Sequence, residues 1–162
     1  MLKHELSKDT AENVNPLMTI RVIWAAILMG LITVAGIMAV IAGGDSSEEP
    51  AVGGAEGLPI VTLLSAGLLL IAIPMAYFLR NQTYKKNWAG DAVTPSGYIT
   101  GNILFVAFLE APGIVSAIAM VVHGGVFPHV LPMIVAAGII LANFPTGRPM
   151  NPAEPRLGVS EK

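Results

Sequence analysis

Four long stretches of this chain are almost free of charged residues, and they restrict its fold more than any other feature of the sequence. Charged residues make up 12% of the 162 residues, whereas a soluble domain of this length carries about 25%. A helix needs about 20 apolar residues to cross the hydrocarbon core of a bilayer. Three stretches meet this requirement and the fourth is near its lower limit. The sequence therefore predicts four transmembrane helices, at about 17–42, 58–79, 98–122 and 127–144.

The predicted fold class is all-α, an integral membrane four-helix bundle. A cytoplasmic N-terminal segment at 1–16 precedes the transmembrane domain at 17–144, and a proline-rich cytoplasmic tail follows at 145–162. The first apolar stretch is longer than the core of a secretion signal, which has about 7 to 15 residues, so we expect an uncleaved anchor. Thr94 and Pro95 offer an N-cap and a first-turn proline for the third helix.

The placement of the basic residues predicts the orientation of the helices. All nine lysines and arginines fall on one side of the four-helix topology. The loops on the other side, GGDSSEEPAVGGAEG and HGGVFPH, contain none. Because loops rich in Lys and Arg stay in the cytoplasm, both termini are predicted to be cytoplasmic. The predicted location is the cell inner membrane, as a multi-pass protein.

Glu110 lies in the middle of the third apolar stretch, where a charged side chain is costly. Insertion scales assign about 2.5 to 3.5 kcal/mol to an acidic residue at this depth, and no Lys, Arg or His falls at the same depth. The neutral acid is therefore the expected resting form. Pro112 follows two residues later and cannot donate a backbone hydrogen bond to the carbonyl of Phe108. Glu110, Phe108 and Pro112 are thus the candidate site for a proton or a small cation, as at the broken helices of transporters.

Three pairs of small residues, each four positions apart, favour close contacts between helices near this site. Two pairs belong to the third helix and surround Glu110, so its side chain is expected to point into a helix–helix contact. The third pair, in the first helix, is expected to face the third helix or a second subunit. Gly30, Leu70 and Ala136 are predicted to lie at about the depth of Glu110. The helix-packing pairs are Ala26 with Gly30, Ala107 with Ala111, and Gly113 with Ala117.

Residues 105–122, FVAFLEAPGIVSAIAMVV, resemble the carboxylate-bearing helix of the proteolipid (c) subunits of rotary ATPases. In that helix a lone Glu or Asp follows an Ala-rich turn and precedes small residues and an aliphatic run. The resemblance implies that Glu110 is a reversible proton or cation carrier. It covers this helix alone, since the second stretch has only Gly67 where proteolipids have a dense glycine repeat. As a whole, the chain resembles the small four-helix membrane proteins of bacteria.

Two functions remain open on these grounds. The chain is a proton- or cation-responsive subunit of an oligomeric membrane complex that uses Glu110, or a non-catalytic scaffold or assembly protein in which Glu110 and Pro112 only shape helix packing. The expected partners are the lipid bilayer and either copies of the chain or other subunits of a membrane complex, with no nucleic acid.

Enzyme activity is not expected, because no phosphate-binding loop, nucleophile elbow or paired His and carboxylate motif appears. No cofactor is expected either. The chain has no Cys, which removes thiolate ligands. His123 and His129 flank the turn before the fourth helix, but two histidines fall short of the three or four protein ligands of a zinc site. No metal is therefore predicted.

Overall fold

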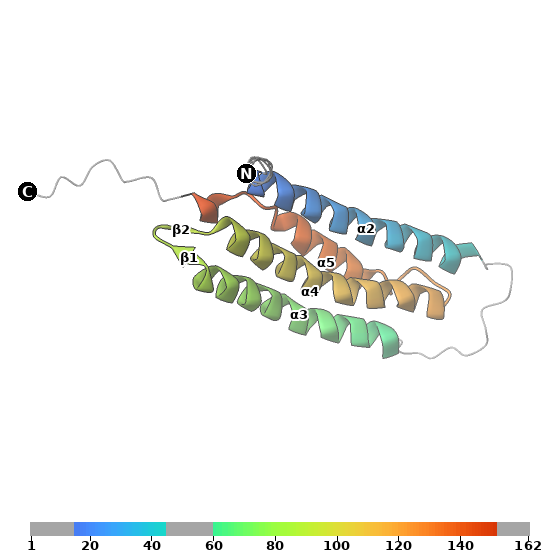
Figure 1. Ribbon diagram of the computed structural model, residues 1–162. Helices are drawn as coiled ribbons and strands as arrows, with labels where there is room; N and C mark the ends of the chain where they lie inside the picture. The colour runs from blue at the N-terminus through green and yellow to red at the C-terminus, as the bar shows by residue number, and fades with distance from the viewer. Residues whose placement is uncertain (1–14, 45–59, 152–162) are drawn as a thin grey trace, which may run out of the picture.

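The computed structural model describes residues 15–44 and 60–151. These residues form an elongated bundle of four α-helices that run side by side, with a small two-stranded hairpin at one end (Figure 1). Three of the helices are long and apolar enough to cross a membrane, as judged by length and composition. The all-α four-helix prediction is confirmed. The elements are α2 (Pro16–Gly44), α3 (Ile60–Lys86), β1 (Trp88–Ala89), β2 (Ala92–Val93), α4 (Pro95–Val122), α5 (Leu131–Ala142) and the 3-10 helix η1 (Arg148–Met150).

The helices differ from the predicted spans mainly in α3 and α5. α3 continues past Leu79, where its apolar stretch ends, to Lys86. It stops where Asn87 donates its side-chain amide to the carbonyl of Thr83 at 2.8 Å. α5 covers only 12 residues of the stretch 127–144. Nearly all of the predicted N-terminal segment and much of the predicted tail lie outside the described residues.

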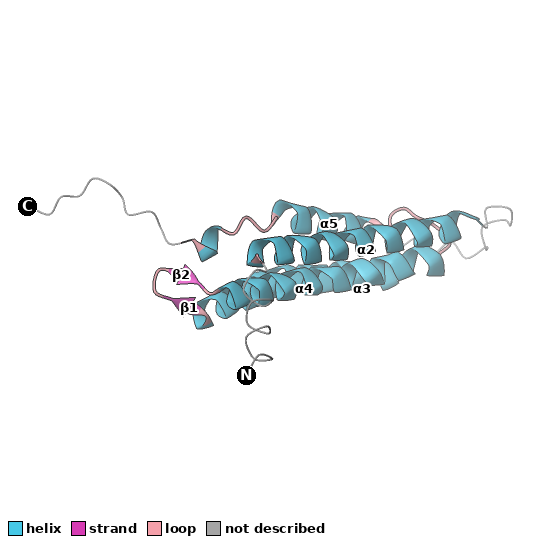
Figure 2. Cartoon of the chain, turned by 45° about the horizontal axis from the view of Figure 1, so that its top comes forward, coloured by secondary structure: helices cyan, strands magenta, loops and turns pink. Residues whose placement is uncertain are grey.

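α4 is the central helix and contacts each of the other three (Figure 2). Its start follows the prediction, because the Thr94 hydroxyl accepts a hydrogen bond from the amide of Gly97 at 3.3 Å and Pro95 occupies the first turn. Along its length α4 buries residues on several sides, among them Leu109 and Met120. The main apolar core therefore lies around α4.

Two glycines of α4 allow neighbouring helices to come close. A Cβ atom on Gly101 would lie 2.6 Å from the ring of Tyr84 in α3, and one on Gly113 would lie 2.9 Å from Cδ1 of Leu31 in α2. Lipid tails are as apolar as leucine, so helices in a membrane associate through close packing of this kind. The two glycines fix how α2 and α3 sit against α4.

The last carbonyls of α5, which a helix leaves without a regular helical partner, accept from the backbone amide of Asn143 and from side chains outside the helix. Trp24 Nε1 of α2 donates to the carbonyl of Ile140 at 3.2 Å. Asn143 Nδ2 donates to the carbonyl of Ile139 at 2.9 Å. The chain then returns to the hairpin end of the bundle, the end that carries β1 and β2, where η1 contacts β2.

The α2–α4 contact yields a stability prediction. Gly113→Leu is expected to lower the free energy of unfolding by about 1 to 3 kcal/mol, because the new side chain overlaps Leu31. Gly30→Leu is the matched control, since a Cβ atom there meets no atom within 4 Å. Thermal unfolding in mild detergent, followed by circular dichroism, measures both changes. Equal losses in the two variants would contradict the importance of this contact.

Candidate functional site

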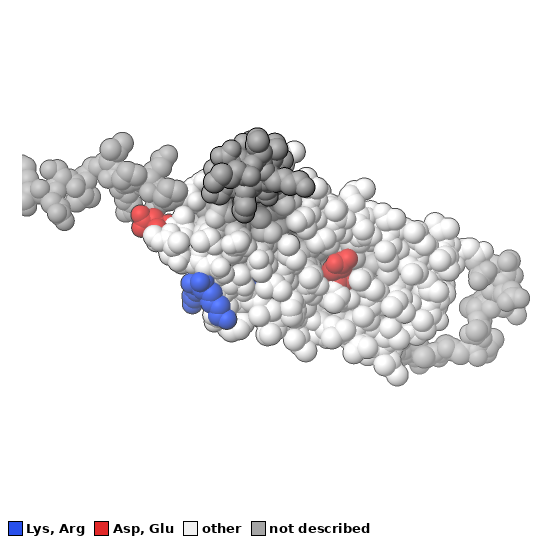
Figure 3. Space-filling model, viewed as in Figure 1, with Lys and Arg blue, Asp and Glu red and all other residues white. Residues whose placement is uncertain are grey.

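Glu110 lies at the middle of α4, half-buried at the side of the bundle. Gly113, which approaches Leu31 of α2, is three residues further along, and residues at this spacing share a helix face. Glu110 therefore lies at the edge of the α2–α4 contact, whereas the sequence predicted a side chain enclosed between helices. Figure 3 shows an acidic side chain surrounded by uncharged surface about halfway along the bundle.

The carboxyl of Glu110 forms no hydrogen bond or ion pair with any residue that the structure describes. The cations in the described ranges occupy the start of α2, the end of α3 and η1, all toward the hairpin end. An uncompensated carboxylate in hydrocarbon is costly. Glu110 therefore has no compensating charge among these residues. The described cations are Arg21, Arg80, Lys85, Lys86 and Arg148.

A polar contact joins α3 to α4 two residues beyond Glu110. Ser65 Oγ donates to the carbonyl oxygen of Pro112 at 2.8 Å, and both residues are buried. α4 is helical through Pro112, which has no amide hydrogen to offer the carbonyl of Phe108. Sequence reasoning missed Ser65. Its only signal was a single hydroxyl within the apolar run LLSAGLLL.

The predicted small-residue pairs have different surroundings. Gly113 and Ala117 are buried, whereas the other four residues are exposed. Only the Gly113–Ala117 pair therefore serves packing within one chain. The predicted contact of the first-helix pair with the third helix is not made within the chain, because that pair lies on the exposed face of α2. The exposed residues are Ala26, Gly30, Ala107 and Ala111.

The residues predicted at the depth of Glu110 do not gather into one site. Leu70 is 73% exposed and Ala136 is fully buried, while Gly30 is exposed. Glu110 is thus the one polar side chain of this predicted layer, and no residue of the layer contributes a second ligand for a cation. The described ranges also contain no group of three or more His, Cys, Asp or Glu residues placed to hold a metal ion.

A second polar cluster lies in the outer turn, residues 123–130, which joins α4 to α5 at the end of the bundle away from the hairpin. Nδ1 of His129 is hydrogen-bonded to Oγ1 of Thr62 in α3, and Ser116 Oγ in α4 donates to the backbone carbonyl of His129. These three residues are buried. His123 stacks on His129 with ring centroids 4.9 Å apart. Burial lowers the pKa of His129 below its usual value, and the neighbouring His123 lowers it further.

A third polar cluster surrounds Arg80 near the hairpin end. Its guanidinium lies 4.3 Å from the ring centroid of Phe105 and 4.9 Å from that of Tyr77. Nη1 of Arg80 donates to Oδ1 of Asn143 at 3.1 Å, and Nδ2 of Asn143 donates to the Tyr77 hydroxyl at 2.9 Å. Aromatic faces attract cations, so Arg80 of α3 is held against α4 and the end of α5 without a carboxylate from the described residues.

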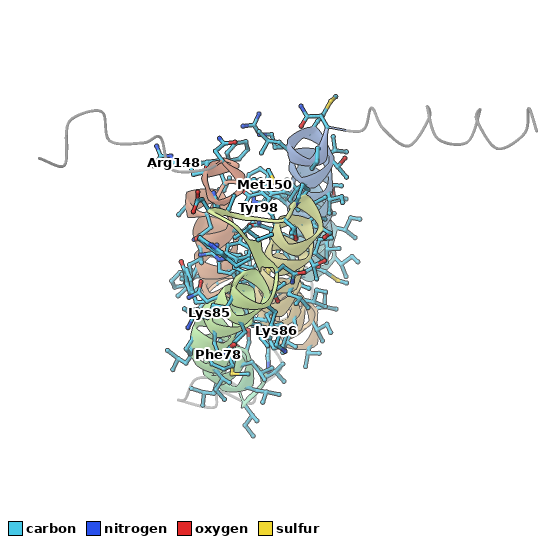
Figure 4. All side chains as sticks on the ribbon, turned by 60° about the vertical axis from the view of Figure 1, so that its left-hand side comes forward. Phe78, Lys85, Lys86, Tyr98, Arg148 and Met150 are labelled. Atoms are coloured by element: carbon cyan, nitrogen blue, oxygen red, sulfur yellow. The ribbon has the colours of Figure 1, made fainter. Side chains whose placement is uncertain are left out.

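A tyrosine pair holds the chain after α5 against the bundle at the same end. Tyr84 and Tyr98 stack with ring centroids 5.8 Å apart, and Asn102 Nδ2 donates to the Tyr84 hydroxyl at 2.8 Å. The amide of Gly147 donates to the Tyr98 hydroxyl at 3.0 Å. In Figure 4, Arg148 and Met150 lie on one side of Tyr98, and Lys85 and Lys86 lie on the other.

Comparison of the chain with protein-family models, with curated proteins and with solved structures finds no match. The function must therefore be argued from the site itself.

The bond from Ser65 to Pro112 yields a second stability prediction. Ser65→Ala is expected to destabilise the bundle by about 0.6 kcal/mol, the average for hydrogen bonds between helices in membranes, and by no more than about 1.7 kcal/mol. Thr33→Ala is the control, because the Thr33 hydroxyl is exposed and bonds the carbonyl of Met29 in its own helix at 2.8 Å. Thermal unfolding in detergent compares the two variants. No difference between them would show that the α3–α4 bond contributes nothing measurable.

Proposed function

We propose that this chain is a small polytopic membrane protein that acts as a proton- or cation-responsive subunit of an oligomeric membrane complex, with Glu110 as the responsive group. The observation that supports this best is a half-buried carboxyl, without a partner among the described residues, in the middle of a 28-residue apolar helix. The resemblance of residues 105–122 to the carboxylate helix of proteolipid subunits points in the same direction.

The surroundings of Glu110 suggest how it would respond. A carboxyl in an apolar environment is least costly with its proton bound. Loss of the proton creates a charge that a cation or a polar group of another subunit must meet. Because Glu110 lies at the side of the bundle, that group would approach from outside the four helices. Ala107 and Ala111 are exposed beside it and leave room for the backbone of a neighbouring helix.

The alternative is a non-catalytic scaffold or assembly protein in which Glu110 and Pro112 only shape helix packing. The Ser65 bond to the Pro112 carbonyl favours this alternative in part, because it joins α3 to this region of α4. Glu110 makes no comparable bond with the described residues. A purely structural role for Glu110 would therefore have to operate between subunits.

We also propose that both termini lie in the cytoplasm and that the membrane is the cell inner membrane. The described cations occupy the hairpin end of the bundle. α2 begins at this end, and the chain after α5 returns to it (Figure 1). Basic segments remain on the cytoplasmic side, so the outer turn would face the opposite side.

Single cysteines test this orientation, because the chain has no Cys of its own. Asp91→Cys in the exposed hairpin turn is expected to react with a membrane-impermeant maleimide only after the cells are opened. Phe127→Cys, at a position that is 74% exposed in the outer turn, is expected to react in intact cells. The reverse pattern would contradict the proposed orientation.

Carboxyl modification tests the role of Glu110. Dicyclohexylcarbodiimide is expected to label Glu110 in membranes and to do so faster at acidic pH, because the apolar reagent adds to a protonated carboxyl. Protection by sodium would identify a cation carrier. Mass spectrometry of the peptide that contains Glu110 measures the labelling. Absence of labelling at every pH would contradict the proposal.

Two controls accompany this measurement. Asp91 is the other acidic residue that the structure describes, and as an exposed hairpin residue it is expected to remain unlabelled by the apolar reagent. Glu110→Gln is expected to lose the label and the response of the complex to pH or sodium while its thermal unfolding is unchanged. If Glu110→Gln kept that response, the scaffold alternative would hold.

A further inference from the structure

We propose that the outer turn is a pH-sensitive switch, in which proton uptake by the His123–His129 pair releases the turn from α3 and α4 and frees the start of α5. This inference concerns residues other than Glu110 and does not depend on the proposed function. The proton would come from the aqueous phase that the outer turn faces, on the side of the membrane opposite the hairpin.

His129 attaches the outer turn to the bundle by two separate bonds. Its backbone carbonyl accepts from the Ser116 hydroxyl of α4, and its ring nitrogen is bonded to the Thr62 hydroxyl of α3. α5 begins directly after the turn, and its N-cap residue Val130 makes no side-chain hydrogen bond. His129 is therefore the hydrogen-bonded attachment next to the first turn of α5, whose Pro132 and Met133 are also buried.

The pairing of two imidazoles makes this attachment sensitive to protons. His129 is 5% exposed, and the ring of His123 stacks on it with centroids 4.9 Å apart. A proton on one ring places a positive charge against the other ring, and two protons place like charges in contact. Both states disfavour the buried position of His129 and favour a turn that has moved into water.

No other charged group in the described ranges is placed to offset this effect. The outer turn and α5 contain no Asp, Glu, Lys or Arg. The charged residues of the described helices around them lie elsewhere, at Arg21 in α2, from Arg80 onward in α3, and at Glu110 in α4. The acidic segment 45–59 lies outside the described residues.

The direction of the response follows from proton linkage. The pKa of His129 is lowered in the docked turn by burial and by His123, whereas a released histidine titrates near its usual value of about 6.5. As the pH falls below that value, His129 binds a proton more readily in the released turn than in the docked turn. The released turn is therefore increasingly favoured. Above it, both forms are neutral and the docked turn keeps its full stability.

A nitroxide spin label on Phe127→Cys reports whether the turn is docked. The full-length chain, reconstituted in liposomes, is titrated from about pH 7.5 to about pH 5, a range that spans the titration of histidine. We expect a mobile component of the spectrum to appear on acidification. A label on Asp91→Cys, at the opposite end of the bundle, is expected to show no change and controls for unfolding.

Two variants assign the transition to the histidines. His129→Gln keeps a neutral polar side chain at the bonding position and is expected to lose the pH dependence, whether the turn is held or free. His123→Phe keeps an aromatic ring against His129 but removes its charge, so the released fraction at each acidic pH is expected to be smaller. A spectrum that does not change with pH, or a transition that survives in His129→Gln, would overturn the switch.

The same titration in Glu110→Gln separates this switch from the proposed function. The transition is expected to be unchanged in that variant, because Glu110 lies outside the outer turn. A transition lost in Glu110→Gln but retained in His129→Gln would overturn the switch and leave Glu110 as the proton-binding group. A missing transition together with pH-dependent carbodiimide labelling would overturn the switch alone.

Discussion

The need to satisfy backbone hydrogen bonds away from water governs the arrangement of this bundle. A bilayer offers no partner for a free carbonyl or amide, so non-helical backbone is tolerated there only where protein covers it. α5 is where this need is greatest, because a helix of 12 residues leaves irregular backbone at both of its ends. Trp24 of α2 binds a carbonyl near one end, and Ser116 of α4 binds the carbonyl of His129 just before the other. The three long helices thus provide the polar environment that the short one lacks.

The contacts that α4 makes with all three other helices explain why it is the central helix. It approaches α2 through Gly113 and α3 through Gly101, and it supplies Ser116 to the outer turn. Each of these positions requires a small side chain, since packing between apolar helices depends on close approach. With three neighbours in place, α4 has only a narrow strip left on the outside of the bundle. Glu110 lies at the edge of that strip, which is why its carboxyl is half-buried and yet has no partner among the described residues.

Features that depend on local sequence could be predicted. Features that depend on how each helix is rotated about its axis in the bundle could not. The apolar stretches gave the number of helices, and Thr94 with Pro95 marked the start of α4 correctly. α3 continues about two turns past the predicted apolar span 58–79, because the end of an apolar run is not the end of a helix and lysines are favourable in a last turn. α5 is shorter than the predicted span 127–144, because the first residues of that span belong to the outer turn, which is bonded to α4.

Polar contacts between helices show the same limit more sharply. Ser65 reaches across to another helix, whereas Thr33 bonds the carbonyl of its own helix, and nothing in the neighbouring sequence separates the two cases. Likewise, Gly113 is packed against α2 while Gly30 meets nothing within 4 Å, although both belong to pairs with the same spacing. Only the rotation of each helix in the bundle decides which hydroxyl or glycine faces a neighbour, and that rotation is a property of the assembled helices.

The two groups proposed to be proton-sensitive, His129 and Glu110, differ in their partners within the described residues. His129 is tied to two helices, by its backbone carbonyl to Ser116 and by its ring to Thr62, so in the proposed switch a proton on the ring acts on the packing of the chain itself. Glu110 forms no hydrogen bond or ion pair with the described residues. A proton on Glu110 would therefore leave the internal hydrogen bonds intact and change only the charge on that side of the bundle. The proposed response at the outer turn would therefore be a change of conformation, whereas the proposed response at Glu110 would change what can lie against α4. Because the two groups sit on different elements, each can be removed while the other keeps its contacts.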